Sequence, residues 1–134
     1  MQYSKCDYGI RREVALPFQQ ALDKTRTALQ EQGFGVLTEI DIKAKLREKL
    51  GVDFKRYVIL GACNPPLAYK ALQAEPEIGL LLPCNVIVYE NDDRSSVVAA
   101  IDPDSMTSVV GDNPAVEQVA RDARARLQKA LAAL

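Results

Sequence analysis

Residues 57–91 decide the fold of this chain, and they read YVILGACNPPLAYKALQAEPEIGLLLPCNVIVYEN. Apolar, β-branched runs at 56–62 and 85–90 predict two strands that are buried in a sheet. Between them, a helical pattern at about 66–74 begins behind Asn64, a residue type that often caps helix N-termini. The stretch therefore predicts two core strands joined through a short helix.

Two Cys-Asn pairs mark the inner ends of these strands and give the candidate site. Cys63-Asn64 follows the first strand, and Cys84-Asn85 opens the second. Cys63 lies just before the predicted helix, where the helix dipole and free N–H groups stabilise a thiolate. We expect Cys84 to face the same crevice, so that the two thiols could form a redox pair or bind a soft metal.

The absence of histidine limits the chemistry that this chain can perform. It contains three cysteines and no histidine, which excludes a Ser-His-Asp triad, a Cys-His pair and a His-based metal site within it. A tetrahedral site made of four thiolates would need a second copy of the chain. No cofactor is therefore predicted, although a soft metal held by Cys63 and Cys84 stays open.

Each candidate residue also has a structural interpretation. Buried free cysteines are common as small apolar side chains, and Asn64 and Asn85 suit cap and turn positions. Tyr69, one turn into the helix, could hydrogen-bond a ligand or could pack with its hydroxyl at the surface. Lys43 opens a basic run, residues 43–51, that is either a solvated face or a rim facing an anionic ligand.

Length and composition indicate one globular domain that spans residues 1–134. The chain has 48% hydrophobic and 26% charged residues and a net charge of -1, which are ordinary values. This balance argues against nucleic acid and against an electrostatic membrane anchor, since both need a basic surface. No apolar run approaches the roughly 18 residues that a membrane span needs, and the N-terminus lacks a signal-peptide core. We therefore expect a cytoplasmic protein with free thiols.

The rest of the chain supplies further strands and helices. The predicted elements are strands at 8–15, 34–42 and 95–101, helices at 18–32, 43–51 and 114–133, and a short helical or looped connection at 104–110. Residues 77–82 fit either a buried strand or a last helical turn. This order favours an α+β fold, a two-layer sandwich in which helices cover one face of a mostly antiparallel sheet of about five strands.

Four segments of the chain resemble a known protein family. They are FGVLTEID from residue 34, GACNPPLAYKAL from residue 61, GLLLPCNV from residue 79 and AAIDP from residue 99. With them the chain resembles, from Tyr8 to the final helix, the bacterial and archaeal domain-of-unknown-function family three-hundred-and-two. The resemblance implies a homodimer and a curved antiparallel sheet backed by helices, like one repeat of the TATA-binding protein. It implies no reaction, and it does not imply DNA binding, since this chain lacks a basic sheet.

We therefore expect a homodimeric binding or interaction domain that holds a small molecule or a soft metal in a crevice between Cys63 and Cys84. The further candidate ligand contacts are Asn64, Asn85, Tyr69 and Lys43. One alternative is a thiol-based redox or sulfur-handling enzyme with Cys63 as nucleophile and Cys84 as resolving thiol. The other is a purely structural dimeric module. Whether the protein is an enzyme stays open at this point.

Overall fold

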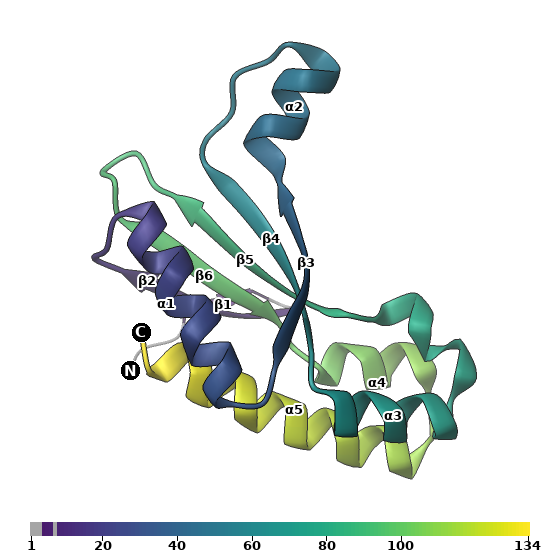
Figure 1. The fold of residues 1–134 in the computed structure, drawn as a ribbon. Helices are drawn as coiled ribbons and strands as arrows, with labels where there is room; N and C mark the ends of the chain where they lie inside the picture. The colour runs from purple at the N-terminus through teal and green to yellow at the C-terminus, as the bar shows by residue number, and fades with distance from the viewer. Residues whose placement is uncertain (1–3, 7) are drawn as a thin grey trace.

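The computed structural model describes residues 4–6 and 8–134, which form an antiparallel sheet and the helices around it (Figure 1). The strands are β1 (Ser4–Cys6), β2 (Gly9–Val14), β3 (Gly35–Asp41), β4 (Tyr57–Cys63), β5 (Cys84–Glu90) and β6 (Ser96–Ile101). The helices are α1 (Phe18–Glu31), α2 (Ile42–Leu50), α3 (Pro65–Ala74), the 3₁₀ helix η1 (Pro76–Leu81), α4 (Asp104–Val110) and α5 (Pro114–Ala132). None of the helices in this described part is long and apolar enough to cross a membrane.

The α+β fold predicted from the sequence is confirmed. The strands lie in the order β1-β2-β6-β5-β4-β3, and each pair of neighbours is antiparallel. Five of these strands were predicted, and β1 adds a short sixth beside β2. The ambiguous segment 77–82 is mostly part of the 3₁₀ helix η1, a form that its run of leucines does not distinguish by periodicity. The likeness to a TATA-binding protein repeat stays a prediction.

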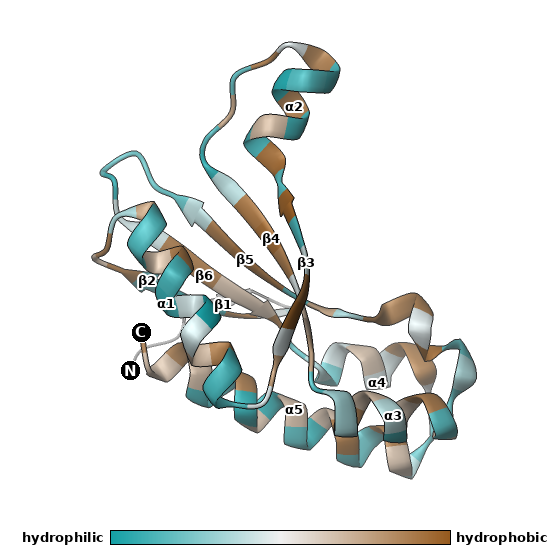
Figure 2. Ribbon diagram, in the orientation of Figure 1, coloured by the Kyte–Doolittle hydropathy of each residue, from teal (hydrophilic) through white to brown (hydrophobic). Residues whose placement is uncertain are grey.

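The core lies between one face of the sheet and the helices α1 and α5. On β4 the side chains of Val58, Leu60 and Ala62 are buried on this face, because strand side chains alternate between the two faces, and Gly61 between them is buried as well. Figure 2 shows the apolar residues along β4 and β5. The buried helical residues that pack against the strands are Phe18, Ala21, Leu22, Ala28, Leu29, Leu127, Ala130 and Leu131. Burying one large aliphatic side chain contributes roughly 1.5–3 kcal/mol, so this layer dominates the stability.

Three predicted helix ends are confirmed, and they fix where the helices begin and stop. The Asn64 side chain accepts a hydrogen bond from the backbone N–H of Leu67 at 3.3 Å and so caps α3. Asn113 caps α5 by accepting from the N–H of Val116, also at 3.3 Å. Gly51 ends α2 with a φ of 67°, a left-handed conformation that glycine adopts without steric cost.

The helix α2 does not cover the sheet. It extends from the ends of β3 and β4 and stands beyond the rest of the fold (Figure 1). None of its residues is buried. The expectation that helices cover one face therefore holds for α1 and α5, whereas α2 forms a projection.

Gly61 permits the close approach of β4 to its neighbours. A Cβ atom at this position would overlap the Thr38 hydroxyl and would lie 2.9 Å from the Cγ of Pro83. The Thr38 side chain could rotate away, but the Pro83 ring moves only with its backbone. A side chain at position 61 would therefore disturb both β3 and the start of β5.

We expect Gly61→Ala to lower the free energy of unfolding by about 1–3 kcal/mol, the usual cost of forcing atoms into a packed site. Urea denaturation followed by circular dichroism measures this loss. Gly79→Ala is the matched control, because a Cβ there would meet its nearest neighbour, the Leu72 side chain, only at 4.0 Å. Equal stability of Gly61→Ala and the unaltered protein would contradict the steric argument.

Candidate functional site

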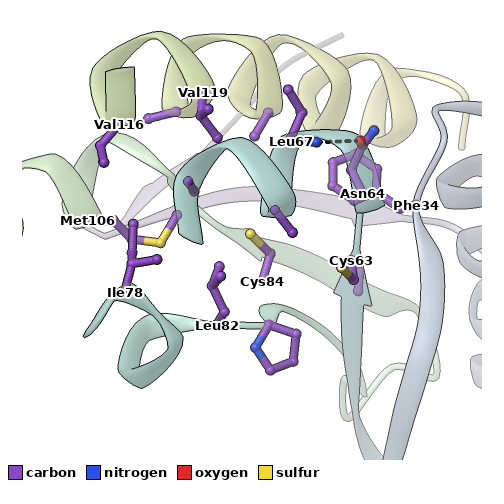
Figure 3. Close-up of a pocket in the computed structure, with 16 residues that line it drawn as sticks. Phe34, Cys63, Asn64, Leu67, Ile78, Leu82, Cys84, Met106, Val116 and Val119 are labelled. Carbon is purple, nitrogen blue, oxygen red and sulfur yellow. Dashed lines mark hydrogen bonds between the residues drawn. The ribbon is translucent and has the colours of Figure 1, made fainter. Parts of the chain in front are cut away.

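A small pocket lies where one end of the sheet meets the surrounding helices (Figure 3). Residues of α3, η1, α4 and α5 surround it, and its volume is ≈ 50 Å³. The residues that line it are Phe34, Ala62, Cys63, Asn64, Leu67, Ala68, Ala71, Ile78, Leu82, Pro83, Cys84, Met106, Val116, Val119, Ala120 and Ala123. Apolar side chains make up most of this wall, so the pocket suits an apolar group better than a polar one.

Cys84 lies within this pocket. It is the first residue of β5, is 7% exposed, and points from the sheet toward α3 (Figure 3). Burial, and to a smaller extent the nearby Cys63, raises the pKa of the Cys84 thiol to about 11. The thiol is therefore protonated at neutral pH, and a protonated thiol is neither a good nucleophile nor a metal ligand.

Cys63 approaches the pocket from a different side. Across β4 and β5 the Cα partner of Cys84 is Ala62, so Cys63 lies one position beyond that pair. Because neighbouring side chains of a strand alternate, Cys63 belongs to the face opposite Cys84. Cys63 still borders the pocket because β4 ends here and the chain turns into α3. Both thiols are free, with Cys84 inside the pocket and Cys63 at its margin.

Asn64 serves as a helix cap beside the pocket. It is 8% exposed, and its side-chain oxygen holds the first turn of α3 through Leu67. Its side-chain nitrogen lies 3.0 Å from where a Cβ on Gly33 would be, so Asn64 also packs against the turn before β3. The interpretation of Asn64 as a cap is confirmed, whereas a ligand contact stays a prediction.

Asn85, Tyr69 and Lys43 lie away from the pocket around Cys84. Asn85 is exposed on the other face of the sheet, in a shallow hollow of ≈ 420 Å³. Tyr69 is 64% exposed on α3. The Lys43 ammonium donates to the Asp53 carboxylate at 2.8 Å, within the projection formed by α2. The structure thus brings together three of the six predicted residues, and a ligand role for the other three stays a prediction.

Lys43 instead lines a polar cleft of ≈ 240 Å³ between α1 and the start of β4. The cleft contains Arg26 and Arg56 together with Glu39 and Asp41. Arg26 forms an ion pair with Glu39, and Asp41 caps α2 through a backbone N–H. Charges of both signs are therefore engaged within the protein, and an anion-facing role for Lys43 stays a prediction.

The open face of the sheet offers a second apolar surface, which is shallow. Tyr57 and Tyr89 stack there with ring centroids 5.5 Å apart and planes inclined by 6°. The Lys55 ammonium lies 5.2 Å from the centre of the Tyr89 ring, within range of a cation–π interaction. This surface differs from the pocket around Cys84 in size, because its hollow has a volume of ≈ 420 Å³ against ≈ 50 Å³ for the pocket.

Sequence reasoning missed the part of the pocket that the C-terminal helices contribute. Met106 of α4 and Val116, Ala120 and Ala123 of α5 all line it. The helical pattern at 114–133 predicted that these α5 residues face inward. It carried no signal that they would face Cys84, because that depends on how α5 crosses the end of the sheet.

The pocket residues do not form a metal site by themselves. Across residues 4–6 and 8–134, no group of three or more His, Cys, Asp or Glu side chains could hold a metal ion. Cys63 and Cys84 would supply two donors at most, whereas a structural tetrahedral site needs four. A soft metal would need further ligands from outside these residues and stays a prediction.

The chain has relatives among protein families and solved structures. No curated protein matches it. It is similar to the crystal structure of an uncharacterized conserved protein DUF302 from Bacillus stearothermophilus, with 29% sequence identity and a TM-score of 0.86. That similarity covers 96% of this chain and 98% of the other. Residues 10–134 match the domain of unknown function DUF302, so the chain belongs to the DUF302 family, as its sequence motifs predicted.

Proposed function

We propose that this DUF302 protein is a binding domain that holds a small apolar group in the pocket around Cys84. The observation that supports this best is the wall itself, in which apolar side chains surround a neutral thiol. Ligand pockets commonly have such apolar walls with few polar groups. A volume of ≈ 50 Å³ suits a short alkyl chain, either as a whole ligand or as the end of a larger one.

A binding role is favoured over thiol chemistry. Reactive cysteines need a thiolate and occur in electropositive, partly exposed surroundings. Cys84, with a pKa of about 11, would be a poor resolving thiol at neutral pH. The chain also has no histidine to accept a proton from Cys63. The thiol-based enzyme and the purely structural module remain the alternatives. Binding of an apolar ligand in the pocket would favour the proposed binding domain over both of them.

The proposed working state is a cytoplasmic homodimer, as the sequence and its family motifs imply. Neither a metal nor nucleic acid is part of the proposal. Two thiols give too few donors for a tetrahedral metal site, and a net charge of -1 gives no broad basic surface for phosphates.

We expect the pocket to bind xenon, and Ala120→Leu to abolish this binding. Apolar cavities of about 150 Å³ stay dry and bind xenon or benzene, and the smaller volume here favours the smaller probe. Ala120 is 2% exposed and lines the pocket, so a leucine side chain there occupies the space that xenon would use. Methyl NMR spectra under xenon pressure should show saturable shifts for Leu67, Ile78 and Val116 in the unaltered protein only.

Ala125→Leu is the matched control, because Ala125 is an exposed residue of the same helix and should leave the xenon shifts unchanged. Filling the pocket should change the free energy of unfolding by no more than about 1–3 kcal/mol.

Organic extracts of the purified protein, analysed by gas chromatography and mass spectrometry, should contain an apolar compound that extracts of Ala120→Leu lack. Xenon shifts that do not saturate, or identical extracts, would remove the basis of the proposal.

The raised pKa of Cys84 predicts a loss of stability at alkaline pH. In the unfolded chain the thiol ionises near its ordinary pKa of about 9, whereas in the folded protein it stays protonated to about 11. Below pH 9 both states hold the proton and the contribution of Cys84 is complete. Between pH 9 and 11 only the folded state keeps the proton, so the free energy of unfolding falls by about 2–3 kcal/mol.

Urea denaturation between pH 8.5 and 11 measures this loss in the unaltered protein, Cys84→Ala and Cys63→Ala. Lysine and tyrosine titrate in all three, so the difference between them isolates the Cys84 thiol. We expect Cys84→Ala to lose about 2–3 kcal/mol less than the other two. Equal losses in all three would mean that Cys84 already ionises readily, which would favour the thiol-based enzyme.

A further inference from the structure

The projection formed by α2 presents apolar side chains that the described chain leaves largely exposed, although the Phe54 ring lies partly covered beside Tyr57 and Lys55. We call residues 42–56, which comprise α2 and the loop to β4, the arm. A helix of nine residues is marginal in water by itself and normally depends on packing of an apolar face. Yet α2 has no buried residue, and Leu50, Val52 and Phe54 are 69%, 46% and 38% exposed.

Polar contacts hold the arm in shape without covering its apolar side. The Asp41 carboxylate accepts from the N–H of Ala44 at 2.9 Å, which caps α2. The Lys43 ammonium bridges the Asp53 carboxylate at 2.8 Å and the Phe54 carbonyl at 2.6 Å. The hydrogen bond from Lys43, followed by the positive charges of Lys43 and Arg47, lowers the pKa of Asp53. The arm is thus preorganised for a contact, which reduces the entropy that binding would cost.

The arm is also strongly basic. Its acidic residues are Glu48 and Asp53, and its basic residues are Lys43, Lys45, Arg47, Lys49, Lys55 and Arg56. Because the whole chain has a net charge of -1, the remainder of the molecule is acidic. A partner for the arm therefore needs a surface that combines negative charge with exposed apolar side chains.

The opposite end of the same molecule has this combination. Figure 1 shows α3 and α4 at the end of the fold far from α2. Residues 71–93 and 95–120 contain no lysine or arginine. The acidic side chains at this end, which we call the acidic end, are Glu75, Glu77, Asp104, Asp112 and Glu117, of which Asp104 forms an ion pair with Arg124. Leu80 and Val109, on η1 and α4, are 84% and 71% exposed beside them.

We propose that the arm of one copy docks onto the acidic end of a second copy, and that the second copy docks its arm in return. Pairing of arm with arm would bring like charges together, which is unfavourable. Because the arm and the acidic end lie at opposite ends, two antiparallel copies can satisfy both contacts at once. Such a dimer is closed and twofold symmetric, whereas a one-way contact would leave both outer surfaces free to add further copies.

Reciprocity also matters for the size of the interface. Stable protein interfaces bury about 1,200–2,000 Å² in total, more than one short helix is expected to supply. A reciprocal dimer forms the contact between arm and acidic end twice, which doubles the buried area. The proposal rests on the homodimer of the proposed function, but not on the ligand proposed for the pocket around Cys84, so the interface and the ligand can fail separately.

Charge reversal tests the dimer and identifies its two surfaces. The arm variant is Lys45→Glu/Lys49→Glu, and the variant of the acidic end is Glu77→Lys/Asp112→Lys, all four residues being exposed. Sedimentation velocity at low salt should give a dimer for the unaltered protein and a dissociation constant at least tenfold weaker for each variant. Mixing the two variants should recover much of the dimer, because the unaltered arm of one variant then meets the unaltered acidic end of the other.

The control Lys24→Glu/Lys129→Glu makes the same change of charge as the arm variant, but on α1 and α5, and should leave the dimer intact. Circular dichroism checks that every variant is folded, and recovery on mixing is a second check. A monomeric unaltered protein would overturn the proposal and would point to a different acidic partner for the arm. A dimer that survives Glu77→Lys/Asp112→Lys, or a mixture that stays monomeric, would also overturn it.

Discussion

The pairing of Ala62 with Cys84 across β4 and β5 is the constraint on which the rest of the structure depends. Because side chains alternate along each strand, this register turns Val58 and Leu60 toward α1 and α5 and leaves Asn85 on the open face. A slip of one residue would expose the whole apolar set and bury an amide without a partner. Burial therefore fixes the register, and the register fixes which cysteine enters the pocket.

Features that depend on residues close together in the chain, such as helix caps, could be predicted from the sequence. The residues of the pocket wall could not, because they come from distant parts of the chain. Asn64 and Asn113 accept from amides three residues further on, so their capping follows from local sequence alone. Met106 and Val116 lie far along the chain from Cys84, and only the packing of α4 and α5 brings them opposite it. We expected both cysteines to share one crevice because each lies at the inner end of a predicted strand. The sequence does not give the strand register, which places Cys63 and Cys84 on opposite faces of the sheet.

Small side chains keep the pocket around Cys84 open. Ala62, Ala71, Ala120 and Ala123 form much of the wall, and the Cys84 thiol behaves as one more small apolar group. Protein interiors are normally filled to crystal-like density. An unfilled space of ≈ 50 Å³ costs about 1 kcal/mol at the usual rate per unit of cavity volume. A bound apolar group would recover dispersion contacts that the empty wall lacks, so binding would also stabilise the fold.

The two proposed surfaces share η1 and α4. Ile78 of η1 and Met106 of α4 line the pocket, while Glu77 and Val109 on the same two elements belong to the outer surface at the acidic end. An arm docked on the outer side would restrain η1 and α4, which form part of the pocket wall. Binding free energies are linked, so whatever effect the dimer has on ligand affinity, the ligand has on dimer affinity. An arm that restrains η1 and α4 before a ligand binds would remove part of the entropy cost of ligand binding, and it should therefore favour the filled pocket.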